Sequence, residues 1–254
     1  MKKRLDVVLV ERGLAESRAQ AQALVLAGRV RGFDKPGTAV EEDAPIDVER
    51  GARFVSRGGE KLDHALDALG VDVRGRLCLD VGASTGGFTD VLLQRGAARV
   101  IALDVGYGQL HPRLRDDPRV VVAERVNARE LRELPFAPDL VTCDVSFISV
   151  RKVLPPVLAL AERGWEVLVL VKPQFEAGRA DVGRGGVVRD SDVHRRVLRE
   201  VAAEALSWSG EVAGVVDSGL PGPKGNREFF LHLVEREQPV LPDAIEDWID
   251  DAVA

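Results

Sequence analysis

The amino-acid sequence predicts an α/β fold, in which a mostly parallel, doubly wound sheet follows a small α+β domain. From residue 75 onward, apolar runs of strand length alternate with helical segments along the 254-residue chain. The early runs are almost continuously apolar, as are parallel strands that helices cover on both faces. The last two runs, 211–218 and 228–235, are joined by a Gly/Pro loop without a helix. That connection predicts an antiparallel pair at one edge of the sheet.

The predicted small domain spans residues 1–52. Residues 4–31 are typical of two short helices, the first ending at Gly13 and the second running from the N-cap candidate Ser17 to Gly28. The residues after Gly28 predict short strands joined by turns. The first part of this domain is richer in basic than in acidic residues, although the whole chain has a net charge of −6. The amino end is therefore a local positive patch, which suits a phosphate backbone.

A linker is expected at 53–59, the larger domain at 60–238 and an acidic tail at 239–254. Helices are expected at 60–69 and at about 86–95, 107–115, 150–163 and 190–207. Strands are expected at 76–82, 99–106, 119–124, 139–146, 166–172, 211–218 and 228–235. The tail predicts one short helix with Ile245, Trp248 and Ile249 on one face. That face either docks on the body or mediates self-association, so a monomer and a weak homodimer both remain open.

The chain is expected to be soluble and cytoplasmic, with no membrane partner. No apolar run approaches the roughly 20 residues of a membrane span. The amino-terminal MKKRLDVVLVERG is a poor signal peptide, because charged residues directly follow its short apolar patch. Cys78 and Cys143 lie in apolar, strand-like runs, as small core residues of a protein in a reducing compartment do. The cysteines and histidines lack metal-ligand spacing, so no metal is predicted.

The segment LDVGASTGGFTDVLL, residues 79–93, joins a predicted strand to a predicted helix. Gly82, Gly86 and Gly87 allow a tight turn and a close approach of the backbone to a ligand. Their spacing is neither that of a phosphate loop nor G-x-G-x-x-G. Asp80 precedes the loop, which favours a cationic sulfonium ligand with an amino-acid tail, S-adenosylmethionine, over a dinucleotide or a purely structural turn. The other candidates in this loop are Ser84, Thr85 and Phe88.

Two further residues are candidates for binding the adenosine part of this cofactor. Asp104 ends the second strand, about 20 positions beyond the glycine-rich loop, where an acidic residue can bind ribose hydroxyls. The alternative is an aspartate that caps a helix or stabilises a turn. Asn127 follows the third strand and could meet the adenine edge, or it could be an ordinary loop residue.

Charged residues at the ends of buried strands predict the reacting centre. Asp144 ends the fourth strand, Lys172 ends the fifth and Glu228 begins the last, while Lys61 lies on the helix before the first. The carboxyl ends of parallel strands and the start of an antiparallel strand share one rim, where ligands bind. A like-charged neighbour and partial burial both favour the neutral form of a lysine, which can take a proton from a hydroxyl. A salt-bridge network at the rim is the alternative.

The segments SRGGEKLDHAL, LDVGASTGGFTD, CDVSF, VKPQF and GNREFF resemble the FtsJ-type ribose 2′-O-methyltransferases. The charged residues match that family's Lys-Asp-Lys-Glu tetrad position by position: Lys61, Asp144, Lys172 and Glu228. The resemblance is closest to the TlyA group, over about residues 3–235. It implies a Rossmann-like class I S-adenosylmethionine-dependent methyltransferase domain, preceded by an RNA-binding domain of the ribosomal-protein-S-four type. One departure is RFVSRGG, where some TlyA proteins carry a tryptophan in the linker.

The resemblance implies 2′-O-methylation of cytidine in ribosomal RNA, with S-adenosylmethionine as cofactor and ribosomal RNA or ribosomal subunits as partners. Lys172 is then the general base, Asp144 and Glu228 orient it, and Lys61 positions the substrate, while Asp144 also borders the cofactor. The expected RNA contacts are Arg4, Arg18, Arg29, Arg31, Arg57, Arg179, Arg184 and Arg189. The last three lie in a Gly-rich segment that fits either a cationic lid or an ordinary solvated loop. The target nucleotide is expected to be distorted or flipped.

Other functions remain open alternatives. TlyA-like proteins often carry the name haemolysin, which implies a membrane-damaging protein, but the sequence offers no spanning segment and its amphipathic helices fit a core. An RNA-binding protein that senses S-adenosylmethionine without catalysis is another alternative, and the complete tetrad argues against it. A third is methylation of a different RNA, such as tRNA.

Overall fold

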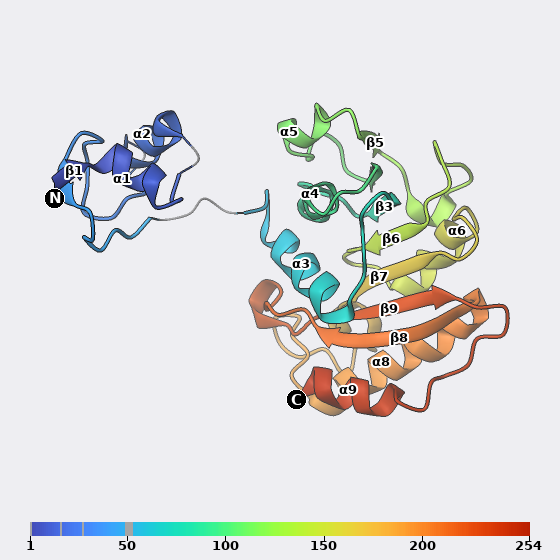
Figure 1. The fold of residues 1–254 in the computed structure, drawn as a ribbon. Coiled ribbons are helices and arrows are strands. Elements are labelled where there is room, and N and C mark those ends of the chain that lie inside the picture. The colour runs from blue at the N-terminus through green and yellow to red at the C-terminus, as the bar shows by residue number, and fades with distance from the viewer. Residues whose placement is uncertain (1, 16, 27, 49–52) are drawn as a thin grey trace. The chain divides into compact units, whose positions relative to one another are not determined.

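The computed structural model describes residues 2–15, 17–26, 28–48 and 53–254. The chain divides into a smaller unit, Met1–Arg53, and a larger unit, Phe54–Ala254, each with its own hydrophobic core (Figure 1). Within the described ranges, none of the helices combines the length and the apolar content that crossing a bilayer requires.

The smaller unit packs two helices against a short two-stranded sheet. Its elements are β1 (Lys2–Arg4), α1 (Leu5–Glu11), α2 (Arg18–Leu26) and β2 (Ala39–Glu41), and β1 pairs antiparallel with β2. The Ser17 hydroxyl accepts a hydrogen bond from the Gln20 N–H at 3.2 Å, so Ser17 caps α2 as predicted. The sequence does not predict β1, because KKR lacks the apolar alternation of a half-buried strand.

A buried carboxylate, Asp6, organises the start of α1. Its side chain is fully buried and accepts hydrogen bonds from Arg4 Nε at 3.0 Å, Arg18 Nη2 at 3.0 Å and Gln22 Nε2 at 2.9 Å. The guanidinium of Arg4 is the main cause that holds the pKa of Asp6 far below its usual range. Two arginines that are expected to contact RNA, Arg4 and Arg18, therefore also hold this unit together.

Asp6→Asn is expected to destabilise the smaller unit by about 2 kcal/mol at neutral pH, because it removes charge-assisted hydrogen bonds from a buried group. Since the folded-state pKa is depressed, this stabilisation is present above the ordinary carboxyl pKa of about 3.9 and is lost as the pH falls below it. Urea titrations at neutral pH and at about pH 3, followed by NMR signals of α1 and α2, measure both effects. The control is Asp47→Asn, whose exposed carboxylate lies 3.4 Å from Arg31. Equal stability of the two variants would contradict the prediction.

The larger unit is built on a seven-stranded sheet in the order β5-β4-β3-β6-β7-β9-β8. The strands are β3 (Leu77–Val81), β4 (Arg99–Asp104), β5 (Val120–Glu124), β6 (Leu140–Cys143), β7 (Glu166–Val171), β8 (Gly210–Asp217) and β9 (Phe229–Glu235). The strands from β5 to β7 are parallel, and β9 runs antiparallel to both of its neighbours. The predicted antiparallel pair at one edge is confirmed. The last strand, β9, lies one position in from the edge strand β8.

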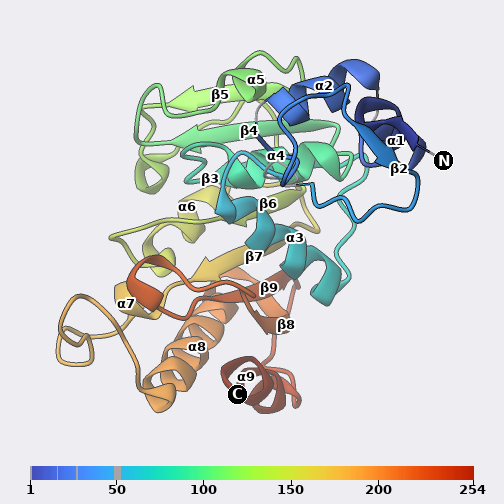
Figure 2. The same ribbon diagram turned by 90° about the vertical axis from the view of Figure 1, so that its left-hand side faces the viewer.

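Helices cover both faces of this sheet (Figure 1, Figure 2). One face is covered by α3 (Arg57–Leu69), α4 (Gly87–Gln94) and α5 (Pro112–Arg115), and the other by α6 (Leu154–Leu158), α8 (Ser191–Ala205) and α9 (Ile245–Val253). A short helix, α7 (Pro173–Glu176), follows β7 directly. The 3₁₀ helices are η1 (Ala128–Glu130), η2 (Val150–Lys152), η3 (Leu206–Trp208) and η4 (Pro223–Gly225).

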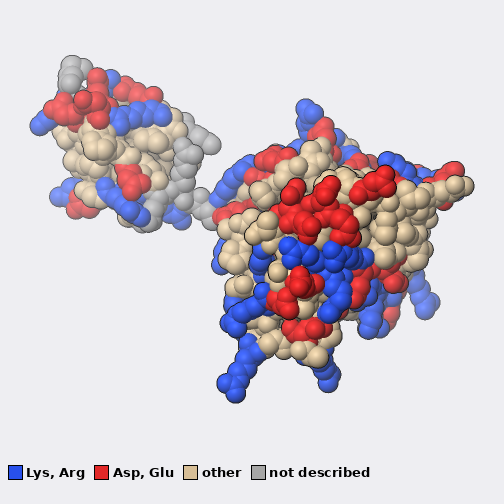
Figure 3. Space-filling view, turned by 90° about the horizontal axis from the view of Figure 1, so that it is seen from below, with Lys and Arg blue, Asp and Glu red and all other residues tan. Residues whose placement is uncertain are grey.

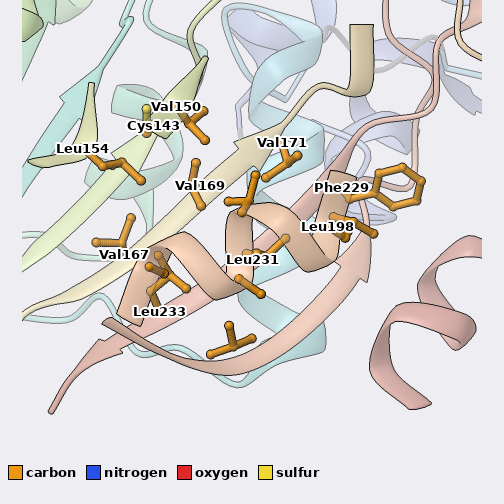
Figure 4. Close-up of a cluster of buried hydrophobic side chains, with 14 of the residues drawn as sticks. Cys143, Val150, Leu154, Val167, Val169, Val171, Leu198, Phe229, Leu231 and Leu233 are labelled. Carbon is orange, nitrogen blue, oxygen red and sulfur yellow. The ribbon is translucent and has the colours of Figure 1, made fainter. Parts of the chain in front are cut away.

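The central strand β7 shows why its sequence is continuously apolar. Val167, Val169 and Val171 point into the core beneath α6 and α8, which Figure 4 shows, whereas Leu168 and Leu170 point into the core beneath α3 and α4. Side chains alternate along a strand, so a strand covered on both faces needs an apolar residue at every position.

Two predicted helices are wrong in extent. The helix predicted at 107–115 shrinks to α5, because Gly108 has a φ of +69° and Pro112 occupies a first-turn position of the helix. The helix predicted at 150–163 is replaced by η2 and the short α6, with prolines at the start of α6. By contrast, α3 begins at Arg57, earlier than the sequence indicates.

The acidic tail is docked on the larger unit rather than extended. Its helix α9 buries an apolar face that includes Ile249 in the core shared with α8 and β8. Arg199 and Arg195 of α8 pair with Glu246 and Asp250 of α9, both at 2.6 Å. Figure 3 shows positive and negative side chains side by side on the surface seen from below Figure 1. Of the two alternatives for the tail, docking on the body is the one that the structure contains.

Candidate active site

The four charged residues predicted for the reacting centre line one cavity of about 200 Å³ in the larger unit. Lys61 Nζ lies 2.5 Å from Glu228 Oε2, and Lys172 forms an ion pair with Asp144. Lys172 also donates to Ser146 Oγ at 3.1 Å. Lys61, Lys172 and Glu228 are all buried, and buried charges persist only when they are paired in this way.

The topology of the sheet brings these residues to one rim. Because Val171 of β7 pairs with Phe229 of β9, Lys172 after β7 and Glu228 before β9 lie side by side. β6 runs parallel to β7, so Asp144, which follows β6, emerges at the same end. The strand order reverses between β3 and β6, at the point where open α/β sheets bind ligands.

The glycine-rich loop after β3 packs against this group. Gly82 has a φ of +84°, and a Cβ there would lie 2.2 Å from the carbonyl oxygen of Asp144. A Cβ on Gly87 would lie 2.2 Å from Ser56 Oγ. Glycine is required at both positions because another part of the chain occupies the space of a side chain. The same cavity is also lined by Ser84, Thr85 and Phe88.

Asp80 does not fit its predicted contact with a cationic ligand. Its carboxylate is fully buried and accepts hydrogen bonds from Thr89 N–H at 2.9 Å, Thr89 Oγ1 at 2.7 Å and Thr142 Oγ1 at 3.3 Å. Burial raises the pKa of Asp80 to about 7. The carboxylate thus holds the first turn of α4, just after its N-cap residue Gly86, and acts on a ligand only through the loop.

Asp104 and Asn127 both organise turns at the rim. Asp104 accepts hydrogen bonds from the Ser84 N–H at 2.8 Å and the Gly106 N–H at 2.6 Å, so it ties the glycine-rich loop to the turn after β4. Asn127 caps η1 by accepting from the Arg129 N–H, and it lines a cavity of about 740 Å³ formed by residues 103–135. These contacts match the turn and loop alternatives. Asp104 is partly exposed and Asn127 is exposed, which leaves both accessible to a ligand.

A further cavity of about 290 Å³ adjoins the first, since Lys172 and Glu228 line both. An aromatic pair borders it: the rings of Phe147 and Phe175 have centroids 5.1 Å apart and an interplanar angle of 47°. Phe147 is 91% exposed and has a φ of +64°. An aromatic face so little covered by protein is available to a planar ligand.

The arginines assigned to RNA binding are mostly at the surface of their own unit. Those that are exposed include Arg29 and Arg31 in the smaller unit and Arg179, Arg184 and Arg189 in the larger unit. Arg57 lines the cavity of about 200 Å³ that Lys61 and Lys172 also line, and it donates to the Pro221 carbonyl at 2.8 Å. The Gly-rich segment that contains Arg179, Arg184 and Arg189 is held to the rim of the sheet by Asn226. The Asn226 side chain accepts a hydrogen bond from the Val188 N–H at 3.1 Å and donates one to the Gly186 carbonyl at 3.0 Å.

Ser146, Phe147 and Glu176 lie at the candidate site but were not predicted from the sequence. Ser146 accepts a hydrogen bond from Lys172, and Phe147 borders the adjoining cavity. Glu176 is a buried carboxylate in the helix after β7, and it bonds to Ser149 and Val150 in the segment after β6. A signal was present, because CDVSF contains the first two and VKPQFE contains the third. Polar and aromatic residues that directly follow a charged strand end lie at the rim with it.

Known proteins resemble the chain over its whole length. The FtsJ-like methyltransferase model matches residues 54–235, and the S4 domain model matches residues 3–31. The chain is 48% identical over 260 residues to the 16S/23S rRNA (cytidine-2′-O)-methyltransferase TlyA of Mycobacterium tuberculosis, covering 99% of this chain and 97% of that protein. It is 39% identical over 238 residues to hemolysin A of Brachyspira hyodysenteriae, covering 91% of this chain and 99% of that protein.

Solved structures of other proteins also resemble the chain. A haemolysin-named protein from Streptococcus thermophilus has a TM-score of 0.76 and 40% identity, over 99% of this chain and 95% of that one. A protein from Listeria monocytogenes, described as an S-adenosylmethionine-dependent methyltransferase, has a TM-score of 0.52 and 17% identity, over 72% of this chain and 100% of that one. The second likeness shows a shared fold.

The family match runs from the first residue of the larger unit to the end of β9, and the chain therefore belongs to the FtsJ-like methyltransferases. The predicted Rossmann-like domain and the preceding small domain, of the S4 type, are both confirmed. Similarity to the mycobacterial protein continues through the smaller unit, which places the chain in the TlyA group of that family.

Proposed function

We propose that the protein transfers a methyl group from S-adenosylmethionine to the ribose 2′-hydroxyl of a cytidine in ribosomal RNA. The observation that carries the proposal is the single cavity in which Lys61, Asp144, Lys172 and Glu228 meet the glycine-rich loop. The mycobacterial relative is named for this reaction on 16S and 23S rRNA, which supports the same substrate class here.

The residues around the glycine-rich loop fit S-adenosylmethionine. Gly82 lets the loop backbone lie directly on Asp144, so backbone groups and a carboxylate face one small polar cavity suited to an amino-acid tail. Asp104, at the end of β4, would hold the ribose hydroxyls, and Asn127 would meet the adenine. When bound, S-adenosylmethionine would supply an electrophilic methyl group on its sulfonium, and the neutral thioether would leave without being protonated.

Lys172 is the proton acceptor in this proposal. Its Nζ in the neutral form takes the proton of the 2′-hydroxyl, and the carboxylate of Asp144 stabilises the resulting ammonium. Ser146, 3.1 Å from Nζ, fixes the direction of the amine. The Lys61–Glu228 pair lines the same cavity next to Lys172 and holds the hydroxyl in line, so these residues act mainly by alignment.

The adjoining cavity suits the nucleotide that carries the reacting hydroxyl. Its aromatic border, Phe147 and Phe175, can stack on a base, and Lys172 lines both cavities. A base can reach such a site only after it leaves its helical stack. The proposal therefore includes flipping or local distortion of the target cytidine.

Transfer of label to ribosomal RNA tests the proposal. Purified protein, tritiated S-adenosylmethionine and ribosomal subunits from a strain that lacks the protein are incubated, and the label is mapped by alkaline hydrolysis and mass spectrometry. Label at one alkali-resistant linkage next to cytidine is the expected result. Label on a base, or none on either subunit although S-adenosylmethionine binds, would contradict the proposal. Label on tRNA instead would favour the alternative substrate.

A further inference from the structure

Glu176 is a buried carboxylate that the proposed chemistry does not use. It ends α7, which starts directly after Lys172, and it is 7% exposed. Its Oε2 accepts a hydrogen bond from Ser149 Oγ at 2.6 Å, and its Oε1 accepts one from the Val150 N–H at 2.8 Å. Both donors belong to the loop that follows Asp144. The carboxylate therefore joins the two segments from which Lys172 and Asp144 project.

Arg151 completes this contact. Its Nε lies 3.4 Å from Glu176 Oε2, and its Nη2 donates to the Glu176 carbonyl at 3.3 Å. On its other side, Arg151 lies 3.7 Å from Glu200 of α8. A buried carboxylate with two hydrogen bonds and a cation is fixed in one orientation, because any other orientation leaves charges unpaired. The loop of residues 144–150 is thus anchored at its far end by Glu176.

At its near end, the 144–150 loop is anchored to the sheet by the Asp144 N–H, which donates to the Val81 carbonyl at 2.9 Å. Between the two anchors lies Phe147, with a φ of +64° and an exposure of 91%. A side chain in this left-handed region crowds its own carbonyl, so the conformation persists only where the surroundings impose it. α7 supplies both the anchor Glu176 and the stacking partner Phe175.

We propose that Glu176 is a positioning residue for the RNA substrate. Its carboxylate holds Phe147 in the exposed, left-handed conformation and so keeps the nucleotide cavity open beside Lys172. This inference rests on the proposed function, because it gives the aromatic pair a base of the RNA to stack on. The cofactor side of the site is expected to be independent of Glu176, since Asp144 is held to β3 by its own backbone.

Steady-state kinetics of Glu176→Ala test this role against a merely structural one. The KM for RNA is expected to rise about 10- to 100-fold, which corresponds to two lost hydrogen bonds to a carboxylate. The dissociation constant of S-adenosylmethionine is expected to stay within about twofold. Glu176→Gln keeps the shape and an acceptor for the Val150 N–H, so it is expected to restore most of the RNA affinity. The matched control is Glu200→Ala, which removes a carboxylate from Arg151 without touching the 144–150 loop.

A double-mutant cycle with Phe147→Ala identifies the residue through which Glu176 acts. The two substitutions are expected to be strongly non-additive in the KM for RNA, because each removes the same stacked aromatic face. Additive effects, or a KM for RNA unchanged in Glu176→Ala, would overturn the inference. If Glu176→Ala does not fold, Ser149→Ala replaces it in the cycle, with an expected rise of about threefold.

Hydrogen exchange separates this inference from the proposed function. In Glu176→Ala the amide of Val150 is expected to exchange at least about tenfold faster than in the wild-type protein, whereas it is unchanged in Glu200→Ala. This measurement needs no methyl transfer. Failure of the wild-type protein to label any RNA would contradict the proposed function, while unchanged exchange at Val150 would contradict the anchoring role of Glu176.

Discussion

Lys172→Ala is expected to lower the kcat of methyl transfer by about 10²- to 10⁴-fold, the usual effect of removing a general base. Binding of S-adenosylmethionine is expected to persist, because the glycine-rich loop, Asp104 and the Lys61–Glu228 pair remain in place. Single-turnover transfer to ribosomal subunits and calorimetric titration with S-adenosylmethionine measure the two effects separately.

Lys172→Arg distinguishes a general base from a rim salt bridge. An arginine keeps the positive charge beside Asp144 but does not give up its proton in proteins. The variant is therefore expected to fold like the wild-type protein and to be as inactive as Lys172→Ala. Activity close to that of the wild-type protein in Lys172→Arg would mean that Lys172 supplies only charge. Lys152→Ala, which removes an exposed lysine from η2, is the matched control and is expected to keep full activity.

Both Lys172 variants are expected to fold because the buried charges form two separate pairs. Glu228, the most buried carboxylate of the group at 1% exposed, is paired with Lys61, not with Lys172. Loss of Lys172 leaves Asp144, whose side chain is 26% exposed and can be hydrated. By the same reasoning, Lys61→Ala leaves the buried carboxylate of Glu228 without its partner. This substitution is therefore expected to destabilise the larger unit much more than Lys172→Ala does.

Much of the fold could be predicted from the sequence, because burial of strands and helices imposes regular patterns of apolar residues. The unbroken apolar run of β7 and the missing helix between β8 and β9 predicted a covered parallel sheet with an antiparallel pair at its edge, as the structure has it. Local errors arose where one residue outweighs a pattern. Gly108 and Pro112 keep the helix predicted at 107–115 from beginning before residue 112, although the surrounding periodicity favours it.

At the candidate site, too, the sequence predicted some features correctly and others wrongly. Strand-end position alone brought Lys172, Asp144 and Glu228 to one rim, since topology decides which strand ends meet. The direction of a side chain is not encoded in this way. Asp80 lies within β3, opposite Thr142 of β6 and two residues before the level of Asp144. Its carboxylate accepts hydrogen bonds from Thr89 of α4 and is fully buried, so it does not line the cavity that Asp144 lines.

Gly82→Ala is expected to lower the affinity for S-adenosylmethionine at least about 100-fold and to destabilise the larger unit by about 3 kcal/mol. Two effects add. The residue has a φ of +84°, which an alanine adopts only with strain, and the new Cβ would lie 2.2 Å from the carbonyl oxygen of Asp144. That oxygen belongs to the backbone, so either the glycine-rich loop or Asp144 has to move, and both belong to the cofactor side of the site.

Gly75→Ala separates the two effects. Gly75 has a similar φ of +74°, but nothing lies within 4 Å of the position that its Cβ would take. Its substitution is expected to cost only the backbone strain, about 1 kcal/mol, and to leave S-adenosylmethionine binding unchanged. Thermal unfolding and calorimetric titration of both variants give the comparison. If Gly82→Ala bound the cofactor as well as Gly75→Ala does, the close packing of the glycine-rich loop on Asp144 would not be a requirement for the site. The loop would then matter for its φ angles alone.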